Sequence, residues 1–72
     1  MKKKRTIIDD LVTEKTKLDD KIMKINNFIR SVEFTHLKDK AKHLLAQQAK
    51  HMTEYSLVLR DRIVDITNQE SE

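Results

Sequence analysis

Residues 6–31 read TIIDDLVTEKTKLDDKIMKINNFIRS, and this stretch decides the fold. Its regularly spaced positions, separated by alternate steps of three and four residues, are Ile8, Leu11, Lys15, Leu18, Ile22, Ile25 and Ile29. Such a seven-residue repeat places these side chains on one face of an α-helix. All of them except Lys15 are apolar. The pattern therefore predicts an amphipathic helix over about residues 6–31, with Thr6 as its N-cap.

A second helix is predicted over about residues 36–67. The intervening residues 31–35 break the repeat, so Thr35 is expected to cap the second helix, and Phe34 to fold back over the turn. The expected seam of the second helix comprises Leu37, Ala41, Leu44, Gln48, Met52, Tyr55, Leu59, Ile63 and Ile66. A short connection makes the two helices antiparallel. The predicted fold is an all-α hairpin whose central seam residues are Leu11, Leu18, Ile22, Ile25, Ile29, Leu44, Met52, Leu59 and Ile63.

Composition supports this fold and predicts self-association. The 72 residues include no Gly, Pro or Cys, which argues against a turn-rich β fold and excludes disulfides and thiolate metal sites. A chain of this length has a small core and usually needs a partner subunit. Further apolar residues widen both seams: Ile7, Val12, Phe28, Leu45, Leu57, Val58 and Val64. We therefore expect a homo-oligomer, either a dimeric four-helix bundle or a higher assembly.

The chain is expected to have three parts, a basic flexible arm over residues 1–5, a hairpin domain over 6–67 and a frayed acidic tail over 68–72. The net charge of +3 comes from the arm, because the remainder of the chain is −1. The arm could bind nucleic acid or an anionic membrane weakly, but neutralisation by the acidic tail is the favoured interpretation. No apolar run is long enough to span a bilayer, and Asp9 and Asp10 interrupt any signal peptide.

The turn end of the hairpin is a candidate anion site. Residues 36–50 contain four lysines against Asp39 alone. Lys38, Lys42 and His43 could together hold a phosphate or an acidic partner. The alternative is an ordinary solvated helix surface, on which pairs such as Asp20 and Lys24 neutralise each other.

A second group of candidates lies further along the chain. Tyr55, with Arg60 and Arg62 nearby, could stack on a base and grip a phosphate. The alternative is a core tyrosine whose hydroxyl reaches the rim. Lys15 is expected near Tyr55, and Gln48 near Asp19; such polar seam residues either mark a ligand cavity, fix the register or reach out to solvent.

Catalysis, cofactors and metals are not predicted. His36, His43 and His51 lack the i, i+4 spacing of helical zinc ligands. No set of nucleophile and base can be assembled from carboxylates along a helix surface, and no Gly-rich loop is present to bind a nucleotide phosphate. The sequence therefore predicts a protein that is not an enzyme.

The pattern resembles small helical-hairpin proteins encoded by tailed bacteriophages, over roughly residues 11–66. The resemblance rests on residues 17–22, residues 28–31, Phe34, Leu44, Leu45, Gln48, Met52, Tyr55, Leu59, Arg62 and Ile63. It implies expression in the cytoplasm of an infected bacterium and an accessory, counter-defence role. Such a protein could capture an anionic, cyclic-nucleotide-like immune signal or block a host protein. A structural coiled-coil adaptor and a nucleic-acid accessory protein using Lys2–Arg5 remain the alternatives.

Overall fold

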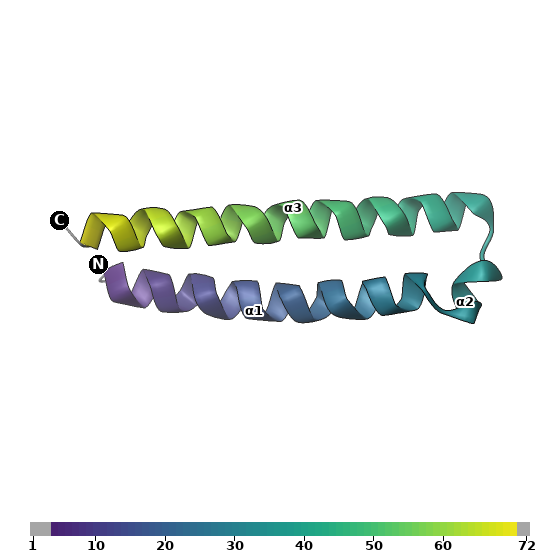
Figure 1. Cartoon of the computed structure of the whole chain (residues 1–72), viewed down its shortest axis with the longest axis horizontal. Coiled ribbons are helices and arrows are strands. Elements are labelled where there is room, and N and C mark those ends of the chain that lie inside the picture. Colours follow the sequence, from purple (N-terminus) through teal and green to yellow (C-terminus); the bar gives the residue numbers. More distant parts are fainter. Residues whose placement is uncertain (1–3, 71–72) are drawn as a thin grey trace.

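The computed structural model describes residues 4–70 and shows an antiparallel helical hairpin (Figure 1). Helix α1 spans Lys4–Ile29, a single turn α2 spans Val32–Thr35, and α3 spans Asp39–Glu70. The two long helices lie side by side along their whole length, and both ends of the described chain lie opposite the turn (Figure 1). The molecule measures 52 × 19 × 14 Å. The predicted all-α hairpin is confirmed.

The seam predicted for α1 is the face that packs on α3. Leu11 is buried, and the other predicted positions are half-buried: Ile8, Lys15, Leu18, Ile22, Ile25 and Ile29. Because α1 has one apolar stripe and its opposite face is polar, this stripe is the face that is buried against α3. The seven-residue repeat therefore predicted the packing face of α1 correctly.

Four positions of the seam predicted for the second helix are wrong. Leu44 and Tyr55 are 52% and 44% exposed, and Ala41 and Gln48 are exposed too. The residues that face α1 also follow steps of three and four: Lys42, Leu45, Ala49, Met52, Ser56, Leu59, Ile63 and Ile66. Two stripes of regularly spaced residues run along α3 one residue apart, and the predicted seam took positions from both. Met52, Leu59, Ile63 and Ile66 were assigned correctly.

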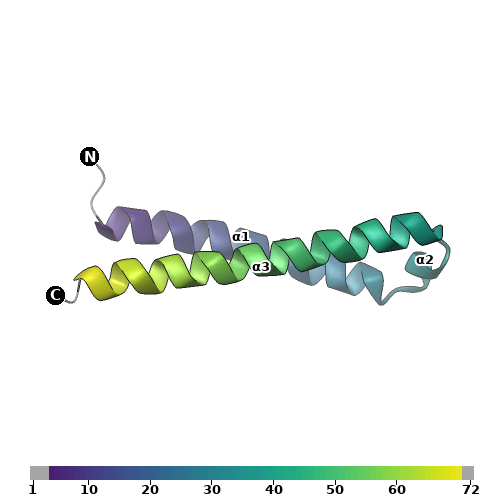
Figure 2. The same cartoon turned by 90° about the horizontal axis from the view of Figure 1, so that it is seen from above.

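The connection between the long helices differs from the predicted one. Ser31 is the N-cap residue of α2, and Thr35 lies inside α2, where its hydroxyl donates to the carbonyl of Val32 at 2.6 Å. Phe34 does fold back, because its ring meets Phe28 edge-on at 6.4 Å (Figure 2 shows α2 at the turn). The ammonium group of Lys42 lies 5.9 Å from the centre of the Phe34 ring. These contacts close the turn end with an aromatic pair and a cation.

Both long helices are displaced from their predicted limits. Helix α1 begins at Lys4, so Thr6 is helical and is not a cap, and α3 continues to Glu70. Residues 1–3 of the predicted arm and 71–72 of the predicted tail lie outside the described residues. Neither long helix, within residues 4–70, is apolar enough to cross a lipid bilayer.

The core between the helices is thin. In the described chain only Leu11, Ala49, Ser56 and Leu59 are buried. Large apolar side chains remain on the surface: Val12, Met23, Phe28, Val32, Leu44, Tyr55, Leu57, Val58 and Val64. A two-helix layer has no third element to cover them, which leaves surface for an interaction.

Candidate functional site

The most prominent polar group on the surface is built around Tyr55. Its hydroxyl donates a hydrogen bond to the carboxylate Oε2 of Glu14 on α1. This bond is the main cause that raises the pKa of Tyr55 above its ordinary value of 10.0; partial burial and the Glu14 charge add to it. The positive charge of Arg62, seven residues further along α3, acts in the opposite direction. The ring is therefore held at the surface by Glu14, and Arg62 lies on the same face of α3 about two turns away.

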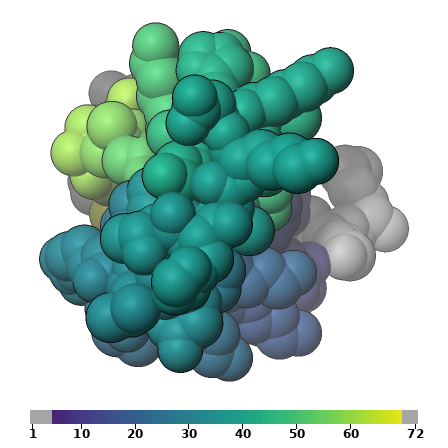
Figure 3. Space-filling view, turned by 90° about the vertical axis from the view of Figure 1, so that its right-hand side faces the viewer, coloured from purple at the N-terminus to yellow at the C-terminus, as the bar shows by residue number. Residues whose placement is uncertain are grey.

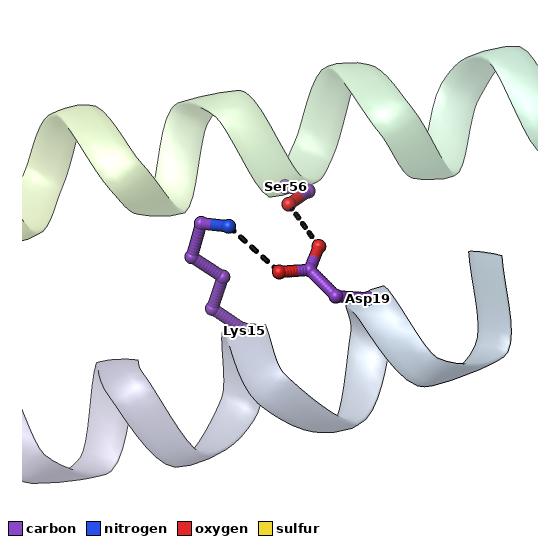
Figure 4. Close-up of polar contacts among 3 residues, drawn as sticks. All are labelled: Lys15, Asp19 and Ser56. Atoms are coloured by element: carbon purple, nitrogen blue, oxygen red, sulfur yellow. Dashed lines mark hydrogen bonds and ion pairs between the residues drawn. The ribbon is translucent and has the colours of Figure 1, made fainter. Parts of the chain in front are cut away.

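A second polar group joins Lys15 and Asp19 of α1 to Ser56 of α3 (Figure 4). Asp19 accepts hydrogen bonds from the ammonium group of Lys15, at 2.7 Å, and from the hydroxyl of Ser56. These bonds, the one from Lys15 first, lower the pKa of Asp19 below its ordinary value of 3.8. Adjacent residues on a helix point about 100° apart, so Ser56 faces α1 in the packed stripe whereas Tyr55 lies on an exposed flank of α3.

The group around Asp19 explains how the α1 seam accommodates a lysine. Lys15 is half-buried, and its ammonium group reaches Asp19 one turn further along α1. Ser56 supplies the only buried polar side chain of the described residues, and its hydroxyl crosses to α1. The contact places Asp19 opposite Ser56, whereas the predicted register placed it near Gln48. Lys15 is thus part of the packing between the helices, separate from the Tyr55 group.

The turn end carries the predicted basic residues, but their exposure and contacts differ. The space-filling view of this end shows long side chains from the start of α3 projecting outward (Figure 3). His43 is exposed, and Lys38 precedes the first turn of α3. Lys42 is half-buried and lies against the ring of Phe34, so it contributes to closing the turn.

The structure therefore separates the predicted ligand-binding residues into groups. Tyr55 and Arg62 share one face of α3 two turns apart, while Arg60 donates from Nε and Nη2 to Asp61, at 3.2 and 3.1 Å. His43 and Arg62 are nineteen residues apart on one helix, which corresponds to about 28 Å at 1.5 Å per residue. Within one hairpin, the basic turn end and the Tyr55 group are two separate sites.

Sequence reasoning missed Glu14, Asp19 and Ser56 as partners in these groups. Glu14 and Asp19 lie on α1, outside its apolar seam, and their roles depend on the register between the helices. Ser56 could have been found from the stripe of α3 that faces α1, in which it takes a seam position between Met52 and Leu59.

The described residues contain no group of three or more histidine, aspartate or glutamate side chains that could hold a metal ion. Over the same residues, 4–70, a single hairpin encloses no pocket.

Comparison with known proteins gives one match. The model of the Sequestin family matches residues 5–65, which include nearly all of α1, the turn and most of α3. No curated protein matches this chain, and no solved structure does so either. Because the matched residues cover most of the chain and both packing helices, the protein belongs to the Sequestin family.

Proposed function

We propose that this protein sequesters an anionic, nucleotide-like small molecule, and that the exposed Tyr55 ring with Arg62 provides the main contacts. The name of the family indicates a binding protein that sequesters its target without catalysis. The observation that carries the proposal is the Glu14–Tyr55 hydrogen bond, which fixes an aromatic ring at the surface, with Arg62 on the same face of α3 two turns away. A base can stack on the ring while the guanidinium group binds a phosphate.

The proposal includes a setting and a form for this activity. We place the protein in the cytoplasm of an infected bacterium, where a phage-type accessory protein would withdraw a cyclic-nucleotide-like immune signal. Sequestration requires only tight, stoichiometric binding, so the absence of a predicted nucleophile and base is no obstacle. Self-association is part of the proposal, and the exposed apolar residues of the hairpin support it.

Thermal unfolding in the presence of nucleotides tests the proposal. The probes are a panel of cyclic dinucleotides, with inorganic phosphate as the control for charge alone. A bound probe at about 100 times its Kd should raise the Tm by roughly 10–20 °C. Arg62→Gln should lose most of this shift. Arg60→Gln is the matched control, since the Arg60 side chain is held by Asp61.

Two results would count against the proposal. An equal loss in both arginine variants would reduce the effect to general charge. If no cyclic dinucleotide shifts the Tm, the small-molecule form fails. Direct blocking of a host defence protein would then be the form of sequestration left to test, and it requires a complex between the two purified proteins.

A further inference from the structure

Helix α3 carries a second seven-residue repeat on its exposed flank. Its members are spaced by alternate steps of three and four residues: Ala41, Leu44, Gln48, His51, Tyr55, Val58 and Arg62. We call these residues the outer stripe. Leu44, Tyr55 and Val58 are 52%, 44% and 51% exposed, although this spacing is the one by which helices pack together. A helix with two adjacent stripes can contact two neighbouring helices, and α1 covers only one of the two stripes of α3.

The surface area of the chain also indicates a missing neighbour. The hairpin exposes 5818 Å², whereas a compact monomer of the same 8.6 kDa mass exposes about 4,700 Å². The excess, about 1,100 Å², is larger than the area that one partner contributes to a stable interface, roughly 800 Å². A second copy of the hairpin would bury such an area without any other protein.

Charge along the hairpin decides the orientation of the second copy. Residues 22–50, at the turn end, contain six basic and two acidic residues. The described residues of the open end, 5–21 and 51–69, contain six basic and eight acidic residues. Parallel copies would align like charges along their whole length. Antiparallel copies bring the basic half of each hairpin against the acidic half of the other.

The pairing of side chains selects one register. When α3 packs on α3 of the second copy around a two-fold axis near residues 49 and 50, Ala41 faces Val58, Leu44 faces Tyr55 and Gln48 faces His51. The small side chain of Ala41 thus faces the larger one of Val58, and the polar Gln48 faces the polar His51. The flanking positions then place Lys40 beside Asp61 of the other copy. A shift of one repeat would instead bring the two Glu54 side chains together.

We propose that a second copy of this chain covers the outer stripe in this antiparallel register, and that each ligand site is completed across the interface. The second part rests on the proposed function. In this arrangement Tyr55 and Arg62 of one copy lie level with Lys38 and His43 of the other. Leu44 of the second copy covers one face of the Tyr55 ring and leaves the other face to the ligand. The two groups that a single hairpin holds about 28 Å apart form one site, and the dimer has two such sites.

Single cysteines test the register, because the natural chain contains none. A mixture of Ala41→Cys and Val58→Cys chains, one of them carrying a mass tag, should form a disulfide-linked heterodimer under mild oxidation. Each variant alone should form little dimer. Leu57→Cys, on the other flank of α3, is the control and should not link to Ala41→Cys. Efficient linking of Ala41→Cys to itself would show parallel packing and overturn the proposal.

A charge exchange tests the register without cysteines. Sedimentation equilibrium should show a dimer for the wild-type chain. Lys40→Glu and Asp61→Lys should each weaken the dimer severalfold, and combining both changes in one chain should restore it. Circular dichroism confirms that each variant remains helical. A monomeric wild-type chain, or a double variant weaker than either single one, would contradict the interface.

Mixing two defective variants tests the shared site. Arg62→Gln and Lys38→Gln chains should each bind a cyclic dinucleotide weakly, since every site of either dimer lacks one cation. After mixing, half of the dimers combine both variants, and each of those regains one intact site, so about one quarter of the sites should recover. No recovery, with the wild-type chain binding, would place the site within one hairpin. A wild-type chain that binds nothing removes the proposed ligand but leaves the cysteine and charge experiments to decide the dimer.

Discussion

Tyr55 offers a direct measurement of the contact between the two helices at the level of one residue. It is the only tyrosine, and the chain has no tryptophan, so ultraviolet absorbance at high pH reports its ionisation alone. The hydrogen bond to Glu14 raises the pKa of Tyr55 above 10.0. Glu14→Gln should therefore lower the pKa of Tyr55 in the folded chain. The same pKa in both proteins would show that the two side chains do not meet in solution.

Asp19 should make the stability of the hairpin depend on pH. Its pKa is lowered in the folded chain by Lys15 and Ser56, so folding favours the ionised carboxylate. The resulting stabilisation is fully present above the unfolded pKa of 3.8, and it is lost as the pH falls through the lower folded value. Urea unfolding of the wild-type chain and of Asp19→Asn should therefore give a stability difference that shrinks below about pH 4. If the stability difference between the wild-type chain and Asp19→Asn stays the same from about pH 2 to about pH 7, this assignment is wrong.

At the level of the helices, burial of one leucine distinguishes the packed stripe of α3 from its exposed flanks. Leu59 is fully buried against α1, whereas Leu57 is 45% exposed. Leu59→Ala should cost about 2–5 kcal/mol, through lost burial and the cavity that remains. Leu57→Ala, the same change two residues away, should cost about 0.5 kcal/mol or less. Comparable losses in urea unfolding would show that the phase of α3 differs from the one described.

The two helices differ in how far their sequence determines their packing. On α1 one stripe is apolar, so local periodicity was sufficient to identify its buried face. On α3, Leu44, Tyr55 and Val58 follow the same period as Leu45, Met52 and Leu59. Local pattern could not choose between them, because the choice depends on α1 and on the turn. The short helix α2 was missed for a similar reason, since its four residues carry no period of their own.

The candidate site shows the same limit. The spacing of Tyr55 and Arg62 along the sequence predicts that they share one face of a helix, and the effect of Arg62 on the pKa of the tyrosine agrees with that prediction. Glu14 could not be assigned, because the contact joins residues 41 positions apart in the sequence. Patterns within a helix were predictable, and contacts that depend on the register between helices were not.

At the level of the whole molecule, the hairpin is a charged rod in which α1 covers one stripe of α3 and the outer stripe is exposed. The two ends of the rod carry opposite charge, and in an antiparallel second copy each residue of the outer stripe from Ala41 to Val58 faces a complementary one. The same geometry that would bury the outer stripe would also join the two halves of the anion site. Oligomerisation and ligand capture would then depend on one interface, so ligand should strengthen the dimer as well as raise the Tm.

Salt distinguishes this arrangement from an interface held by apolar contact alone. Raising NaCl from 50 to 500 mM shortens the Debye length from about 14 to about 4 Å, which screens the attraction between opposed ends. The two exposed Lys40–Asp61 pairs between copies contribute about 1 kcal/mol, so the dimer Kd should rise roughly fivefold. The chain with Lys40→Gln and Asp61→Asn should associate more weakly at low salt and respond less to added salt. Sedimentation equilibrium measures both, and a wild-type dimer that tightens as salt is added would exclude antiparallel charge pairing, because like charges brought together are the ones that screening relieves.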